Sequence, residues 1–276
     1  LVVLRDGAAV FADSRYWEQA EKELADTTIE LVKIGKGGSV RHVSWIAETL
    51  QKGQKLGVDG DVLGLGAADY LKREMSKAGI EVVTDFDILD AMWQERPPMP
   101  PEAVYEHLPP FAAVSRADKL AKVRDEMKKV GATHHFVSTL DDIAWIFNLR
   151  GSDVNFNPIF LGHAIIEADS ARIFVAPGKV DDALREVLSA DGVRIEDYGT
   201  TKEALRSIPG DATLLIDPSR VTLGLVEQLP TSCTIVKQMN PSTLFKSRKT
   251  DAEAAHIRKV MEEDGAAMCE FYAWFD

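Results

Sequence analysis

Two arginines lie in sequence contexts that could present a cation to a ligand. Arg15 follows Asp13 where an expected strand gives way to an expected helix. Asp13 is a natural N-cap, which would place Arg15 in the first helical turn, where a cation opposes the helix dipole. The favoured interpretation is a local ion pair with Asp13 or a neighbouring carboxylate. The alternative is an outward contact to an anion or a peptide.

Arg150 is the second such residue. It follows the apolar run of residues 143–147, and Gly151 permits a tight turn that would present the neighbouring polar side chains. The favoured interpretation is a salt bridge between Arg150 and Asp153 within this loop. A ligand contact is again the alternative.

The histidines and cysteines do not have the spacing of a metal site or of a catalytic nucleophile. The sequence contains no HExxH motif, no CxxC motif and no GxSxG elbow. His134 and His135 are adjacent on an expected strand, so their side chains point to opposite faces and cannot readily share a metal ion. Cys233 and Cys269 are far apart in the sequence, which predicts no disulfide framework and fits a reducing compartment. We expect no catalytic residue and no metal ligand in this chain.

Two glycine-rich segments resemble phosphate loops only in part. Residues 35–39 (GKGGS) lack the GxxxxGK[ST] spacing. After Gly64 and Gly66, the third glycine of a dinucleotide fingerprint is replaced by Asp69, whose charge would oppose a pyrophosphate. Both segments are expected to join a strand to a helix.

The elements that position these residues alternate between short apolar runs and amphipathic segments, which is typical of an α/β fold. In the first half we expect strands at residues 8–12, 29–34, 55–58 and 80–84, and helices at residues 14–24, 42–50 and 67–78. In the second half, Ser115 and Asp118 have capping-box spacing, and the periodicity predicts a helix at residues 116–130 that Gly131 ends.

A proline-rich segment separates the two halves. Six of the twelve prolines lie between Pro97 and Pro110. Each proline lacks an N–H and forces the residue before it toward extended geometry, so the segment cannot hold a helix or a central strand. We therefore predict a linker at residues 97–113.

The two halves resemble one repeated unit. Residues 6–11 (DGAAVF) resemble residues 169–174 (DSARIF), each followed by an expected helix, and residues 57–59 (GVD) resemble residues 215–217 (LID). The second copy has residues 119–168 ahead of its DSARIF strand, whereas the first copy has only residues 1–5. We expect a duplicated α/β unit with the first copy truncated at its N-terminus. Chance agreement in the α/β order of the elements is the alternative.

The last segment predicts a helix with an apolar stripe. Thr250 and Glu253 form a capping box, and Ile257, Met261 and Phe271 are among the apolar residues within reach of one stripe. Aromatic residues near the chain end have little left to pack on. We therefore expect the chain to be part of a longer protein.

Composition and charge exclude several classes of protein. The chain has 276 residues, enough for two domains with a core each. Its 32 Lys and Arg against 44 Asp and Glu give a formal charge of −12, which would repel a phosphate backbone, so we expect no nucleic-acid partner. No stretch approaches the roughly 20 apolar residues of a membrane helix, and no targeting segment is visible.

Residues 141–154 (DDIAWIFNLRGSDV), followed by residues 157–160 (NPIF), closely resemble the second-domain signature of the long, three-domain Xaa-Pro aminopeptidases (aminopeptidase P). Residues 12–16 (ADSRY) resemble a segment of the family's first domain. Trp93 with Arg96-Pro97 resembles the end of that domain, and residues 254–274 resemble the first helix of the catalytic domain. The resemblance spans essentially the whole chain.

The resemblance implies two creatinase N-terminal-like α/β domains, each a mixed sheet flanked by helices, followed by a pita-bread metallopeptidase domain. On this basis residues 1–96 are the C-terminal part of the first domain, residues 97–113 the linker and residues 114–248 the second domain. Residues 249–276 are then the first helix of the catalytic domain. In that family the catalytic domain binds two divalent metals, usually manganese, through two Asp, one His and two Glu, for which this chain has no matching positions. The resemblance also implies a cytoplasmic homodimer.

The resemblance further implies substrate-binding residues. Arg15 matches an arginine that contacts peptide substrate from the first domain, although Ser14 stands where the family usually has glycine. Arg150, Asn148 and Asp153 are carried over from the second-domain signature. The implied function is the non-catalytic N-terminal portion of an Xaa-Pro aminopeptidase, inactive alone and serving substrate access, orientation and assembly. The alternative is a free-standing interaction or dimerisation module, and a single-domain relative such as creatinase fits less well.

Overall fold

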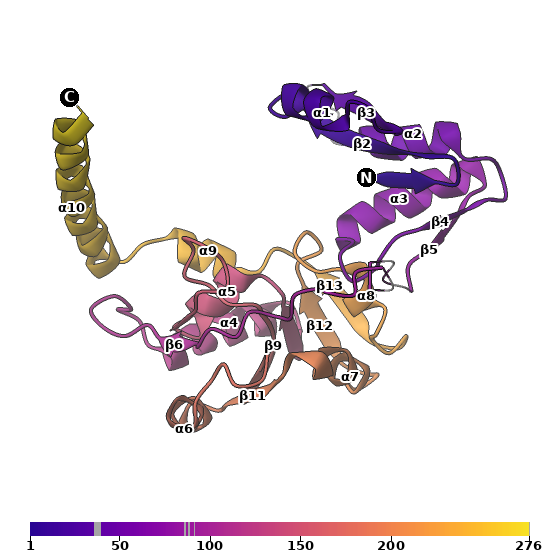
Figure 1. The fold of residues 1–276 in the computed structure, drawn as a ribbon. Coiled ribbons are helices and arrows are strands. Elements are labelled where there is room, and N and C mark those ends of the chain that lie inside the picture. The colour runs from indigo at the N-terminus through magenta and orange to yellow at the C-terminus, as the bar shows by residue number, and fades with distance from the viewer. Residues whose placement is uncertain (36–39, 86, 88, 91, 276) are drawn as a thin grey trace. The chain divides into compact units, whose positions relative to one another are not determined.

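The computed structural model describes residues 1–35, 40–85, 87, 89–90 and 92–275, and its chain divides into two compact units (Figure 1). Unit 1 comprises residues 1–58 and 67–86, and unit 2 comprises residues 59–66 and 87–276. Both units contain strands and helices in alternation, as an α/β fold requires. Of the glycine segment at residues 35–39, only Gly35 lies among the described residues.

Unit 2 is built on a six-stranded mixed sheet. Its order is β11-β10-β9-β7-β12-β13, in which β9 runs antiparallel to β10 and β7 while the other five strands are parallel. The strands are β7 (His134–Val137), β9 (Gly162–Glu167), β10 (Ala171–Val175), β11 (Val193–Asp197), β12 (Thr213–Ile216) and β13 (Thr234–Lys237). Buried apolar side chains on β9 and β10, such as Ile166 and Ile173, belong to the core beneath the helices.

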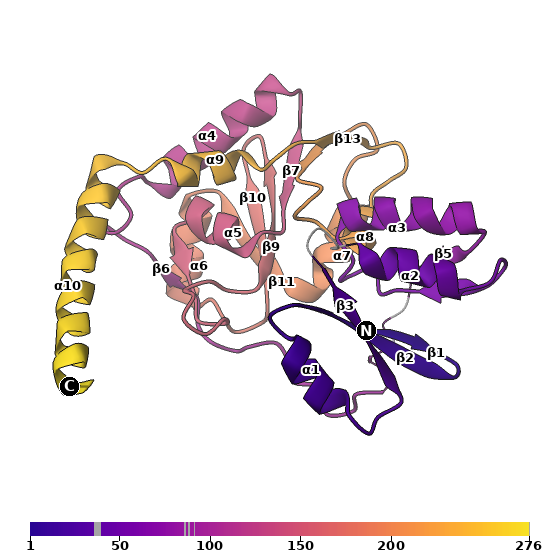
Figure 2. The same ribbon diagram turned by 90° about the horizontal axis from the view of Figure 1, so that it is seen from above.

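The helices of unit 2 connect these strands. They are α4 (Arg116–Lys129), α5 (Leu140–Ile146), α6 (Asp182–Ala190), α7 (Thr201–Arg206), α8 (Leu223–Val226) and α9 (Pro241–Ser247), with the short turn η1 (Tyr198–Thr200). Helices α4, α5 and α9 pack against one another (Figure 2). The predicted cap of α4 is confirmed, because the Ser115 hydroxyl accepts the Asp118 N–H at 3.1 Å.

Unit 1 has a smaller version of this arrangement. Strand β1 (Val2–Leu4) is antiparallel to β2 (Gly7–Asp13), which is parallel to β3 (Ile29–Ile34), and β4 (Lys55–Gly57) is parallel to β5 (Glu81–Val83). Its helices are α1 (Trp17–Leu24), α2 (Arg41–Thr49) and α3 (Leu65–Ala78). Strand β1 was not expected from the sequence, because an exposed three-residue run has no readable period.

The repeat expected from the sequence is visible in the order of the elements. A hairpin followed by a helix and a parallel strand forms β1-β2-α1-β3 in unit 1 and β9-β10-α6-β11 in unit 2. Strand β4, helix α3 and strand β5 correspond to β12, α8 and β13. In unit 2, β7 joins the two halves of the sheet, and among the described residues of unit 1 no strand joins β1 to β4.

The first helix begins later than predicted. It starts at Trp17 rather than at Ser14, and its N-cap is Tyr16, which makes no side-chain capping bond. Asp13 is the last residue of β2, and its carbonyl accepts the Tyr16 N–H at 3.0 Å, so residues 13–16 form a turn. The prediction that Asp13 caps a helix containing Arg15 is therefore wrong.

The proline-rich segment belongs to unit 2 and packs against the rest of that unit. Val104 is buried and donates its N–H to the Lys179 carbonyl at 2.8 Å. Strand β6 (Tyr105–Glu106) then pairs antiparallel with β8 (Leu149–Arg150). A two-residue edge strand is compatible with nearby prolines because its outer edge needs no partner.

The chain ends in helix α10 (Asp251–Phe275), whose predicted capping box is confirmed. The Glu253 carboxylate accepts the Thr250 N–H at 2.8 Å, and the Thr250 hydroxyl accepts the Glu253 N–H at 3.2 Å. None of the helix residues that the structure describes is buried. Among the described helices, none is both long and apolar enough to cross a membrane.

Candidate functional site

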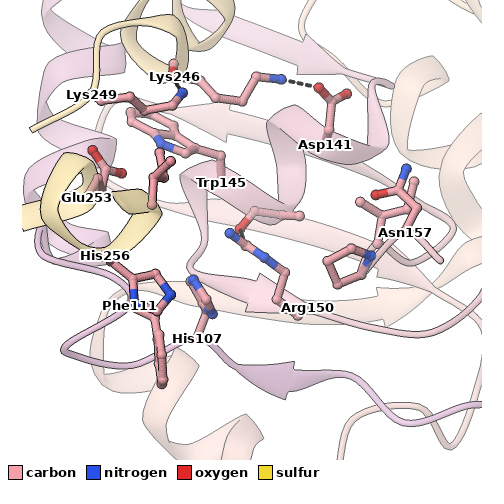
Figure 3. A pocket seen from close by; sticks show the side chains of 14 residues that line it. His107, Phe111, Asp141, Trp145, Arg150, Asn157, Lys246, Lys249, Glu253 and His256 are labelled. Atoms are coloured by element: carbon pink, nitrogen blue, oxygen red, sulfur yellow. Dashed lines mark hydrogen bonds and ion pairs between the residues drawn. The ribbon is translucent and has the colours of Figure 1, made fainter. Parts of the chain in front are cut away.

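Arg150 lines a cavity of about 370 Å³ in unit 2 (Figure 3). Helix α5 contributes Asp141 and Trp145, and the docked proline-rich segment contributes His107. The end of α9 and the start of α10 contribute lysine, glutamate and histidine side chains. The cavity therefore joins segments that are distant in the sequence, and we call it the Arg150 cavity.

The Arg150 guanidinium is held by backbone carbonyls. Its Nη1 donates to the carbonyls of Ala144 and Leu149, both at 2.9 Å. The expected salt bridge with Asp153 is absent, because Asp153 pairs with Lys179. Burial lowers the pKa of Arg150. Since the hydrogen bonds found in the described chain engage only Nη1, the Nε and Nη2 groups can still bind a carboxylate or a carbonyl.

Aromatic rings form the apolar wall of the cavity. Phe111 packs against His107 at 5.8 Å and against His256 at 4.9 Å between ring centroids. The Lys119 ammonium lies 4.3 Å from the centroid of the Trp145 ring, which fixes that indole by a cation–π contact. Burial lowers the pKa of His107, with further contributions from Arg150, Lys119 and His256. These rings, with Arg150, line the same cavity and give it an aromatic wall.

The other charged side chains around the cavity already have partners, which are carboxylates for Lys246 and backbone groups for Lys249 and Glu253. Lys246 pairs with Asp141 and lies 3.2 Å from an Asp142 carboxylate oxygen (Figure 3). Lys249 donates to the Lys246 carbonyl, and Glu253 caps α10. Arg150 and Lys249 therefore both line the cavity with cationic donors that no carboxylate engages among the described residues, and either can hold an anionic or carbonyl group beside the aromatic rings. The site supplies binding groups, and no group of three His, Cys, Asp or Glu in the described chain is placed to hold a metal ion.

The structure gives Asn148 and Asp153 architectural contacts. Asn148 is buried with a left-handed φ of 51°, and its side chain accepts from Lys119 Nζ at 2.6 Å and donates to the Val114 carbonyl at 2.9 Å. The Asp153 side chain is fully buried, 2.5 Å from Lys179 Nζ, and accepts the Leu161 N–H at 2.7 Å. Substrate binding by either residue stays a prediction, and these contacts already explain why the loop has both.

The close neighbours of Gly151 explain why this loop has a glycine at that position. A Cβ built on Gly151 would lie 2.7 Å from the Phe160 Cβ and 3.2 Å from the Ile159 carbonyl oxygen. Real Cβ atoms do not approach this closely, so the loop passes its neighbour only because residue 151 lacks a side chain. The contacts of Asn148, Gly151 and Asp153 thus fix the backbone of the loop from which Arg150 reaches the cavity.

Arg15 lies in unit 1 on the turn that follows β2. Its Nε and Nη2 donate to the Asp13 carboxylate at 3.0 and 2.8 Å, so the predicted local ion pair is confirmed. The Arg15 side chain is 76% exposed, and its guanidinium lies 5.6 Å from the centroid of the Tyr16 ring. The hydrogen bond from Arg15 lowers the pKa of Asp13 to about 2, so this carboxylate stays charged at neutral pH. Nη1 remains able to reach a ligand.

Sequence reasoning did not select several lining residues of the Arg150 cavity. Asp141 and Trp145 stood within the quoted signature, which was a usable signal. His256 likewise stood within the quoted segment of residues 254–274. His107 and Lys246 had no such signal, because they belong to different segments and only the fold brings them together.

The fold and its repeat define the class of protein. This chain belongs to the creatinase/prolidase N-terminal domain family, whose models match residues 1–92 and residues 95–253. The expected duplication is thereby confirmed at the level of the family.

The most similar relatives include aminopeptidases. Aminopeptidase P2 of Arabidopsis thaliana is 29% identical, over 100% of this chain and 43% of that protein. A probable Xaa-Pro aminopeptidase P of Sordaria macrospora is 31% identical, over 100% of this chain and 47% of that protein. This chain therefore spans less than half the length of either relative.

A solved structure has the same fold. The X-prolyl aminopeptidase of Caenorhabditis elegans, described as a cytosolic enzyme with a di-nuclear active site, aligns with a TM-score of 0.90 at 22% identity. The alignment covers 99% of this chain and 45% of that protein. It shows that the fold is shared over essentially the whole chain.

Proposed function

We propose that this chain is the N-terminal, non-catalytic portion of a metal-dependent aminopeptidase that removes the first residue from Xaa-Pro peptides. The observation that carries the proposal is similarity over the entire chain to Xaa-Pro aminopeptidases, of which the chain spans less than half. The hydrolysis would take place in a further domain that holds two divalent metal ions, for which we expect Mn²⁺. The parent protein would be a cytoplasmic homodimer.

The role of this chain in that enzyme is to bind and orient the peptide. A bond that precedes proline has no N–H, so selection depends on the shape of the site and on holding the rest of the peptide. Arg15 supports this role because its guanidinium is exposed while Asp13 fixes its direction. Arg150 would support it with donors beside an aromatic wall.

The test uses the full-length enzyme with Arg15→Ala. We expect a higher KM for Xaa-Pro peptides with kcat little changed, since lost binding outside the reacting atoms acts on both ground and transition states. The matched control is Arg73→Ala, because Arg73 is also exposed, pairs with Glu74 and lies 5.0 Å from the Tyr70 ring. Unchanged kinetics for Arg15→Ala, or an equal change in both variants, would remove Arg15 from the substrate site.

A free-standing interaction or dimerisation module is the second candidate function. The observation that favours it is the exposed apolar stripe of α10, where Ile257, Met261 and Phe271 are each at least 44% exposed. Light scattering coupled to gel filtration of residues 1–276, together with a peptidase assay of the complete gene product, separates the two candidates. A stable dimer from a gene whose product does not cleave Xaa-Pro peptides would favour the module.

A further inference from the structure

A second cavity, of about 470 Å³, opens in unit 2 at the carboxyl ends of the parallel strands. Ser138 follows β7, Tyr198 follows β11, and Gly162 begins the antiparallel β9. The chain runs from β7 to β9, β10 and β11 on one side of the sheet, then crosses through η1 and α7 to β12 on the other side. Ligands of open α/β sheets bind at such reversals of strand order.

A buried histidine, His163, is among the residues that line this cavity, which we call the His163 cavity. His163 Nδ1 lies 3.0 Å from the Ser138 hydroxyl, and Nε2 lies 3.1 Å from the Tyr198 hydroxyl. The His163 and Tyr198 rings stack at 4.9 Å between centroids. The side chains of Ser138, His163 and Tyr198 are therefore held in place by one another.

The histidine leaves one hydroxyl hydrogen available for a ligand. Burial lowers the pKa of His163 to about 4, so the imidazole is neutral at neutral pH and has a single N–H. One neighbouring hydroxyl accepts that N–H, and the other donates to the second nitrogen. The hydroxyl that accepts, from Ser138 or from Tyr198, keeps its own hydrogen for a third partner in either tautomer.

The histidine does not make Ser138 a catalytic nucleophile. A general base must accept a proton near neutral pH, and the low pKa of His163 makes it a weak base. The second nitrogen contacts a tyrosine, whereas a serine nucleophile needs a carboxylate there to stabilise the imidazolium. The arrangement therefore suits the binding of a ligand and does not suit nucleophilic catalysis.

The rest of the lining combines apolar side chains with a charge pair. Leu140, Leu161 and Leu225 line the cavity, and Thr222 has a buried hydroxyl without a hydrogen-bond partner. An unpaired buried hydroxyl is costly, and a ligand reached by rotation of the Thr222 side chain would remove that cost.

Lys202 and Asp61 supply the charges. Their side chains are about half-exposed and form an ion pair at 2.6 Å. The segment that holds Asp61 is fixed to α8, because Gly224 donates its N–H to the Gly60 carbonyl at 2.8 Å. A ligand with a single charge would separate the pair and leave one partner alone, whereas a ligand with both charges replaces one pair with two.

We propose that the His163 cavity binds a small zwitterion of amino-acid or dipeptide size. Its carboxylate contacts Lys202 and the available hydroxyl, its ammonium contacts Asp61, and its apolar part lies against the leucines. The volume lies within the range of small-molecule sites. The proposal does not depend on the proposed peptidase function, since it uses neither Arg15 nor the residues of the Arg150 cavity.

The test is titration of residues 1–276 with L-leucine and with L-alanyl-L-leucine at pH 7. Binding is measured by calorimetry and by the shifts of the amide NMR signals. N-acetyl-leucine lacks the ammonium and leucinamide lacks the carboxylate, so both should bind at least tenfold more weakly. The proposal would be overturned if N-acetyl-leucine or leucinamide bound as tightly as L-leucine. It would also be overturned if the amide shifts around residues 138, 163 and 198 did not saturate at 10 mM ligand.

Variants separate this cavity from adventitious binding. We expect Lys202→Met to weaken zwitterion binding about tenfold, the loss of one charged contact. The combined Ser138→Ala and Tyr198→Phe variant, which removes both hydroxyls and keeps the ring, should weaken it as much. The control is Lys259→Met, an exposed lysine paired with Glu263 on α10. Equal affinity in all three variants would assign the binding to another surface, and circular dichroism checks that each variant is folded.

Discussion

The two units repeat the same order of elements but differ at the middle of the sheet, where unit 2 has a central strand. In unit 2, β7 lies between β9 and β12 and makes one continuous sheet of six strands. In unit 1, the corresponding strands β1 and β4 belong to separate ladders in the described chain. A central strand is covered on both faces and pairs along both edges, so its presence decides how much backbone and side-chain surface the unit buries.

The buried side chains are also larger in unit 2 than in unit 1. Strand β2 buries Ala9 and Ala12, whereas the corresponding β10 buries Ile173, Phe174 and Val175. Hydrophobic stabilisation scales with the apolar area removed from water, so small residues contribute less. Unit 2 should therefore hold most of the stability, and unit 1 should open first in local unfolding.

The largest expected effect comes from removing one buried charge of unit 2. Asp153→Ala would leave Lys179 unpaired where both side chains have no solvent exposure, at a cost of about 3–5 kcal/mol. Lys55→Ala breaks the exposed Lys55–Glu81 pair of unit 1 and should cost about 0–1 kcal/mol. Urea unfolding followed by circular dichroism measures both.

A double variant checks that this cost arises from the isolated charge. Asp153→Asn with Lys179→Met removes both charges, changes the side-chain volumes little and keeps an acceptor for the Leu161 N–H, so it should be more stable than Asp153→Ala. If the exposed and buried pairs cost the same, the contrast between the units is lost.

The second effect is a pH dependence expected of unit 2. Burial lowers the pKa values of His135 and His163 to about 4, below the ordinary value of 6.5. Between these values the unfolded chain binds protons that the folded chain does not, so stability falls as the pH falls from 6.5 toward 4. Each histidine contributes about 1.4 kcal/mol per pH unit.

The measurement is urea unfolding of the chain and of His163→Gln at several pH values. The variant should lose part of the slope between pH 6.5 and pH 5, and it should be compared with His256→Gln on the exposed α10. A slope that His163→Gln leaves unchanged would contradict the assignment.

A third effect tests the loop that contains Arg150 and Gly151. Gly151→Ala would place a Cβ 2.7 Å from the Phe160 Cβ and should destabilise unit 2 by about 1–3 kcal/mol. Gly7→Ala in unit 1 meets its nearest neighbour at 4.0 Å and should have little effect. Thermal unfolding of the two variants gives the comparison, and similar melting temperatures would show that the loop can yield.

The smallest effect concerns Arg15. Because its side chain and that of Asp13 are exposed, Arg15→Ala should leave thermal stability almost unchanged. Stability and KM are then separable at this residue. A clear drop in the melting temperature would mean that the residue serves the architecture of unit 1 instead of a ligand.

Much of the fold could be predicted from the sequence because local patterns carry it. The strand at residues 29–34 and the helix from Arg116 were predicted almost to the residue, and the capping boxes at Ser115 and Thr250 formed as expected. The sites were less accessible. Arg150 was identified as a candidate, but its predicted partner was wrong because Lys179, distant in sequence, competes for Asp153.

The amino-acid sequence by itself determined the α/β class, the duplication and the local ion pair of Arg15, because periodicity, capping and pairs two residues apart depend on neighbours along the chain. The tertiary structure alone decided which buried charges pair, how the proline-rich segment packs within unit 2, and which side chains surround Arg150 and His163. Those contacts join residues tens of positions apart. Their energies depend on burial and distance, which exist only once the sheet has formed.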